Sequence, residues 1–137
     1  MTFSEESITL QQWTVNATSF QPCENVYFTS WWSSATVPQH NYGTTLVLVA
    51  PDGRNVAQKD TTVADIPMQL WEANHPYFDE RVLTVPCDAA PGEYQLKMGM
   101  YRGIEGGFVD LTAFTTDGEE QGVRGFLTGI QVEAKGD

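Results

Sequence analysis

A run of short strand-like segments separated by turns, from Pro22 to Arg102, is the feature that most constrains how this chain can fold. Residues 26–32 and 94–101 alternate between apolar and polar side chains, the period of a half-buried strand. Pro51-Asp52-Gly53 marks a turn between two such segments, because Pro fixes φ at one corner and Asp-Gly tolerates positive φ at the next. No stretch shows a sustained helical period.

The spacing of these segments defines a fold class. The expected strands cover residues 7–15, 26–32, 44–50, 55–59, 80–86, 94–101, 108–114 and 126–133. Short strands with turns about every ten residues are typical of sandwiches. The sequence therefore predicts an all-β protein, an immunoglobulin-like antiparallel β-sandwich of roughly seven to nine strands.

The adjacent residues Trp31 and Trp32 fix the expected orientation of the second strand. Neighbouring residues of a strand point to opposite faces, so we expect Trp32 in the core and Trp31 on the other face with Tyr27. The remaining side chains assigned to the core are Leu46, Leu48, Leu96 and Met98.

Composition places the chain among folded soluble domains. Its 137 residues are 41% hydrophobic and 18% charged, and the net charge is −11. We expect one domain over residues 1–137. The acidic surface disfavours nucleic acid and anionic membrane surfaces as partners. No apolar run reaches the roughly 18 residues of a membrane span, so the chain is either cytosolic or a domain excised from a larger exported or membrane protein.

The order of several short motifs is more specific than any one of them. A strand ending in Trp follows Pro22-Cys23-Glu24, and an Asp-Gly turn precedes Ala57-Gln58-Lys59-Asp60. Trp71 stands alone before an apolar strand that ends at Pro86, and residues 91–101 read Pro-Gly-x-Tyr-x-Leu-x-x-Gly-x-Tyr. Residues 117–118 repeat Asp-Gly before a last apolar strand.

This order, over about residues 7–133, resembles the soluble β-sandwich domain at the C-terminal end of many bacterial and archaeal multi-spanning membrane glycosyltransferases. Those enzymes are similar to protein mannosyltransferases and to the aminoarabinose transferase family. The resemblance implies an extracytoplasmic accessory domain, with the catalytic carboxylates in a membrane portion. The chain departs from the pattern at Cys23, where the family has Gly, and at Glu72-Ala73-Asn74, where it has Pro-Gly.

Residues suited to catalysis form no convincing set. His40 and His75 lie in separate loops, and a zinc site with them would also need Asp79 and Glu80 to converge. There is no Gly-x-Ser-x-Gly elbow and no phosphate-binding glycine loop. We therefore expect no enzyme activity, no cofactor and no metal.

Aromatic side chains are the better lead, because sugars stack on exposed Trp and Tyr rings. Trp31 and Tyr27 form one candidate platform, and Trp71 with Tyr77 and Phe78 forms another at a loop edge. The alternative is that these aromatics cap the ends of the sandwich.

Cys23 and Cys87 are the only cysteines, and they are either two free thiols or a disulfide. Cys23 precedes the second strand and Cys87 follows the strand ending at Pro86. In an immunoglobulin-like sandwich those strands are antiparallel neighbours, so the two sulfurs meet at one edge. A disulfide requires a Cα–Cα separation below about 7 Å and implies an oxidising compartment.

Two functions remain open at this point. In the first, the chain is a non-catalytic accessory domain of an extracytoplasmic glycosyltransferase that contacts a glycan or a sugar-lipid headgroup. In the second, it is a structural or protein-interaction sandwich that packs against the rest of a larger membrane protein. Aligned exposed aromatics beside amides favour the first, and a flat apolar strand face favours the second.

Overall fold

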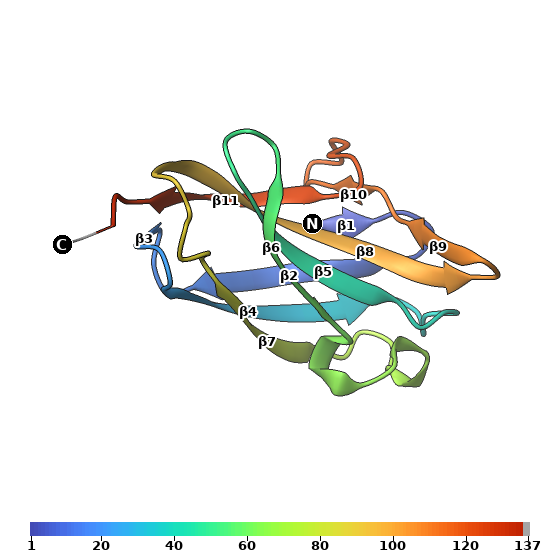
Figure 1. Ribbon diagram of the computed structural model, residues 1–137. Coiled ribbons are helices and arrows are strands. Elements are labelled where there is room, and N and C mark those ends of the chain that lie inside the picture. The colour runs from blue at the N-terminus through green and yellow to red at the C-terminus, as the bar shows by residue number, and fades with distance from the viewer. Residues whose placement is uncertain (136–137) are drawn as a thin grey trace.

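The computed structural model describes residues 1–135 as two β-sheets packed face to face (Figure 1). Gly136 and Asp137, the last residues of the expected domain, lie outside the described part. One sheet has the order β10 (Ala113–Phe114), β1 (Thr2–Phe3), β2 (Ile8–Val15), β4 (Asn25–Ser34) and β7 (Tyr77–Thr84). The other has the order β3 (Ser19–Phe20), β11 (Gly125–Val132), β8 (Gly92–Ile104), β5 (Gly43–Val49) and β6 (Asn55–Thr61), with β9 (Gly107–Asp110) also pairing with β8.

The sandwich predicted from the strand pattern is confirmed, and its details differ in three respects. Over residues 1–135 there are eleven strands rather than seven to nine, because the structure also contains three strands of only two residues each, β1, β3 and β10. One of these, β3, pairs with β11 in parallel. The expected strand over residues 108–114 divides into β9 in one sheet and β10 in the other.

The connection between β6 and β7 contains two 3-10 turns, η1 (Val63–Asp65) and η2 (Met68–Leu70). Within residues 1–135, no helix has the length and apolar character needed to cross a membrane.

The orientation of β4 follows its alternating sequence. Val26, Phe28, Ser30 and Trp32 are buried, whereas Trp31 is 41% exposed. The predicted contrast between Trp32 and Trp31 is therefore confirmed. Ser30 is a polar residue in this core row because its Oγ accepts a hydrogen bond of 2.8 Å from Trp32 Nε1, which satisfies the buried indole.

The core lies between the two sheets. The predicted core residues Leu46, Leu48, Leu96 and Met98 are all fully buried. They come from β5 and β8 and belong to the same buried cluster as Trp32 and Phe28 of the opposite sheet. The interior therefore joins both sheets in one apolar contact region.

A buried ion pair also lies inside the sandwich. Arg81 Nε donates to Asp79 Oδ2 at 2.8 Å, and both side chains are almost fully buried. Arg81 also donates to Thr44 Oγ1 and approaches Met98 Sδ at 3.7 Å, so it reaches from β7 to the opposite sheet. Burial lowers the pKa of Arg81, and the charge of Asp79 opposes that effect.

Cys23 and Cys87 form a disulfide with their Cα atoms 4.4 Å apart, well within the limit of about 7 Å. β4 and β7 are antiparallel neighbours, as the topological argument requires. Two backbone hydrogen bonds continue the pairing of these strands up to the disulfide. The Cys23 N–H donates to the Val85 carbonyl, and the Val85 N–H donates to the Glu24 carbonyl, both at 2.9 Å. Cys23 has a φ of 75°, a left-handed conformation that glycine adopts most readily. Gly is the residue expected at this position from the pattern that the sequence resembles.

Candidate functional site

Three cross-strand pairs form a strip on the outer face of the five-stranded sheet. Tyr27, Thr29 and Trp31 of β4 lie directly opposite Val82, Glu80 and Phe78 of β7. We call these six residues the outer-face strip. They face outward because β4 and β7 alternate, and the intervening residues of both strands are buried. The strip thus has an apolar pair at each end and a polar pair in the middle.

Trp31 and Phe78 form the aromatic end of the strip. Their ring centroids lie 4.9 Å apart with the planes tilted by 51°, within the range of favourable aromatic contacts. Trp31 is 41% exposed and Phe78 is 37% exposed. The pairing therefore holds the indole in place while part of it remains accessible to solvent.

A β-bulge in β2 places two amides beside Trp31. The pairing of β2 with β4 shifts between Leu10 and Gln12, so Gln11 is an extra residue. Gln11 and Gln12 are adjacent in sequence and both exposed, where a regular strand would turn one of them inward. Together with Trp31 and Pro76 they line a shallow hollow of about 310 Å³.

A second hollow, of about 350 Å³, covers the other end of the strip. Its lining includes Tyr27, Thr29, Glu80 and Val82, and Lys59 of β6 borders it. Tyr27 is 52% exposed, and its backbone N–H is held by Asn16 Oδ1 at 2.9 Å. The two predicted platform residues of β4 thus lie on one accessible face, each beside its own hollow.

Trp71 and Tyr77, the other predicted binding residues, are not accessible. Trp71 is only 2% exposed, and its ring stacks on Tyr77 with centroids 4.4 Å apart and an interplanar angle of 16°. Trp71 Nε1 donates to the Ile66 carbonyl at 3.2 Å, and the Tyr77 hydroxyl accepts from the Glu72 N–H at 2.7 Å. We therefore withdraw both as binding residues, because the pair closes the end of the sandwich, which was the alternative for Trp71.

Sequence reasoning assigned Phe78 to the wrong platform and missed Gln11, Gln12 and Pro76. Phe78 belongs with Trp31 because β7 begins at Tyr77, three residues before the strand expected from the sequence. The alternation of apolar and polar residues from Tyr77 onward carries that signal. The bulge that exposes both glutamines has no equivalent signal in the sequence.

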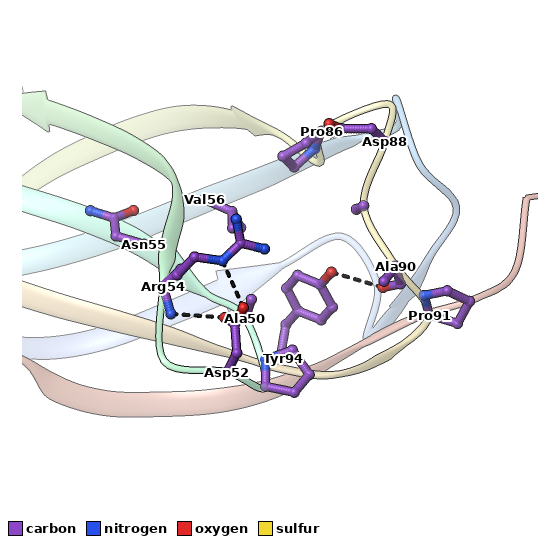
Figure 2. Close-up of a pocket in the computed structure, with 12 residues that line it drawn as sticks. Ala50, Asp52, Arg54, Asn55, Val56, Pro86, Asp88, Ala90, Pro91 and Tyr94 are labelled. Carbon is purple, nitrogen blue, oxygen red and sulfur yellow. Dashed lines mark hydrogen bonds and ion pairs between the residues drawn. The ribbon is translucent and has the colours of Figure 1, made fainter.

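A larger hollow, of about 540 Å³, lies between the loops that flank β5 and β8 (Figure 2). Several of its polar groups bond to other residues that line the hollow. Arg54 donates to Asp52 through its side chain at 2.7 Å and its backbone N–H at 3.1 Å, and these bonds lower the pKa of Asp52. The Tyr94 hydroxyl donates to the Ala90 carbonyl at 2.7 Å. These bonds hold Asp52, Arg54 and the Tyr94 hydroxyl in structural contacts.

The two histidines lie against aromatic rings. The His40 ring meets the Tyr42 ring edge-on, with centroids 5.9 Å apart. The His75 ring is tilted against the Tyr77 ring, with centroids 4.8 Å apart. Within residues 1–135, no three His, Cys, Asp or Glu side chains are arranged to hold a metal ion.

The fold and the site define the class of protein, which is an immunoglobulin-like sandwich with the outer-face strip on one of its sheets.

No protein-family model and no curated protein sequence matches the chain. The structure is similar to the C-terminal domain of Wzt, with a TM-score of 0.57 and 10% identity, covering 97% of this chain and 76% of that one. It is also similar to the alkylpurine DNA glycosylase AlkC of Pseudomonas fluorescens, solved with DNA containing an abasic-site analogue, with a TM-score of 0.55 and 12% identity. That match covers 96% of this chain and 32% of AlkC. At such identities the similarity shows a shared sandwich fold.

Proposed function

We propose that this chain is a non-catalytic carbohydrate-binding sandwich, accessory to an extracytoplasmic glycosyltransferase. The observation that carries the proposal is the position of Trp31, an exposed indole with the amides of Gln11 and Gln12 beside it. An aromatic ring stacks on the apolar face of a pyranose, and amides bond its hydroxyls. The glycosyltransferase context comes from the resemblance of the sequence motifs.

The disulfide supports an extracytoplasmic location. Cys23 and Cys87 are both exposed at one end of the sandwich, so cytosolic thiol reductants would have access to the bond. A bond with this exposure persists where the surroundings are oxidising, such as the periplasm or the cell surface.

The test is a calorimetric titration of the 137-residue chain with neutral oligosaccharides. We expect saturable binding that Trp31→Ala abolishes while the circular dichroism spectrum is unchanged. The matched control is Phe126→Ala, which removes another half-exposed aromatic from the other sheet and should leave binding intact. Failure of the wild-type chain to bind any oligosaccharide, or equal binding by Trp31→Ala, would refute the proposal.

A protein-interaction role is the second candidate, and one observation favours it. The β8–β9 hairpin extends beyond the sandwich (Figure 1) and carries Phe108, which is 72% exposed and contacts Tyr101 edge-on at 5.5 Å. Ile104 is exposed on the same hairpin. In this case the hairpin packs against the rest of a larger protein, and Phe108→Ala rather than Trp31→Ala weakens that association.

A further inference from the structure

The spacing of the two aromatic ends of the outer-face strip limits what can bind across it. Tyr27 and Trp31 are four residues apart on β4, which places them about 13 Å apart along the strand. Stacked rings have centroids about 4.5–7 Å apart. One sugar ring therefore cannot stack on both side chains, and each aromatic contacts a different unit of a longer ligand.

The middle of the strip is polar. Thr29 lies directly opposite Glu80, and its hydroxyl is hydrogen-bonded to the hydroxyl of Thr14 on β2. The interface cores of protein partners are depleted in charged residues, so Glu80 at the centre of the strip argues against a protein as occupant. Hydroxyl and carboxylate groups between two ring-stacking positions instead match the hydroxyl-rich middle of a sugar chain.

The charge of the surface selects among glycans. Glu80 is at the centre of the strip, and the whole chain carries a net charge of −11. Two cations line the hollow beside it, but Arg81 is buried in its pair with Asp79, so Lys59 is the exposed one. Such a surface repels polyanions. The strip is therefore suited to uncharged sugars and unsuited to uronic acid or phosphorylated polymers.

From these features we infer that the outer-face strip binds an internal stretch of a linear, uncharged polysaccharide that runs along β4. Trp31, Phe78, Gln11 and Gln12 hold one sugar, Thr29 and Glu80 bond the hydroxyls of the units between, and Tyr27 with Val82 contacts a later sugar. This inference rests on the proposed function and deepens it, because it assigns the ligand a minimum length, a direction and a charge.

The test is a length series. Homo-oligomers of glucose, mannose and N-acetylglucosamine, from the monosaccharide to the hexasaccharide, are titrated into the wild-type chain and into Tyr27→Ala, with oligogalacturonate as the anionic counterpart. For the sugar type that binds, we expect the affinity to rise about tenfold or more between the disaccharide and the hexasaccharide. Tyr27→Ala should remove most of that gain and leave disaccharide binding unchanged, and oligogalacturonate should not bind.

The outcomes distinguish failure of this inference from failure of the proposed function. Binding that depends on Trp31 but is equally strong for short and long oligomers, or unaffected by Tyr27→Ala, overturns the inference and leaves the proposed function standing. Preference for oligogalacturonate overturns the inference as well. No binding of any sugar refutes both, and a dimer in sedimentation that Trp31→Ala dissociates would assign the strip to a second copy of the chain.

Discussion

Arg81 donates a 2.8 Å hydrogen bond to Asp79 inside the sandwich, and the two residues lie two positions apart on the same edge strand. Both side chains point inward because β7 alternates regularly. Asp79 also accepts from the Ala64 N–H at 2.9 Å, which ties η1 to this strand. The pair therefore connects an edge strand, a loop and the opposite sheet.

Removing the cation of this pair should be severely destabilising. Arg81→Met leaves the Asp79 carboxylate buried without a counter-charge, which typically lowers the free energy of unfolding by about 3–5 kcal/mol. Arg81→Met combined with Asp79→Asn removes the orphaned charge and keeps an acceptor for Ala64, so the double variant should recover part of the loss. Urea denaturation measures both, and a double variant less stable than Arg81→Met alone would contradict this account.

Trp31 and Trp32 should differ sharply in their effect on stability. Trp32→Ala removes a fully buried ring and should lower the free energy of unfolding by about 3–5 kcal/mol. Trp31→Ala removes a partly exposed ring and should cost about 1 kcal/mol or less. Chemical denaturation of the two variants gives the comparison directly. Equal losses would show that the orientation of β4 is wrong.

The disulfide should contribute substantially to stability. Cys23 and Cys87 are 64 residues apart in sequence, and closing a loop of that length stabilises the fold by about 4 kcal/mol in the chain-entropy model. Cys23→Ser/Cys87→Ser should therefore unfold at a lower urea concentration. The same shift should appear when the wild-type chain is reduced, and reduction should leave the double variant unchanged.

The Glu5 carboxyl should titrate differently when Arg102 is absent. Arg102 Nε donates to Glu5 Oε2 at 2.9 Å, and this hydrogen bond lowers the pKa of Glu5. Because the folded-state pKa lies below the unfolded one, the stabilisation is present above the unfolded value and is lost as the pH falls through the folded value. The contribution is small because both groups are near the surface. NMR titration of the Glu5 side chain should show a higher pKa in Arg102→Ala, and an unchanged pKa would mean that the pair does not form in solution.

The sequence predicted the parts of the structure that depend on local periodicity. Alternation alone placed Trp32 in the core and Trp31 and Tyr27 on the opposite face, because the side-chain period of a strand is two residues. The Pro51-Asp52-Gly53 turn was also predictable. In the structure, a hydrogen bond of 2.9 Å from the Gly53 N–H to the Ala50 carbonyl closes it.

Features that depend on pairing between distant strands were not predictable in the same way. Two-residue strands such as β1 and β10 exist because their partners align them, and so few residues carry no periodic signal. The β2 bulge changes only the register against β4, and no residue of β2 marks it. The burial of Trp71 follows from its stacking on Tyr77, six residues later, across a connection whose path no local pattern determines.

The most direct test of the central claim is the tryptophan indole region of a 15N–1H NMR spectrum during titration with the oligosaccharide that binds. The chain has four tryptophans, and only Trp31 belongs to the outer-face strip. The account predicts that the Trp31 Nε1–H signal shifts most and saturates with the ligand, whereas the signals of the buried Trp32 and Trp71 stay in place. A titration that shifts the Trp71 signal would contradict the prediction. So would one in which the backbone amides around the hollow of Figure 2 shift in the same spectrum while the Trp31 indole signal stays in place.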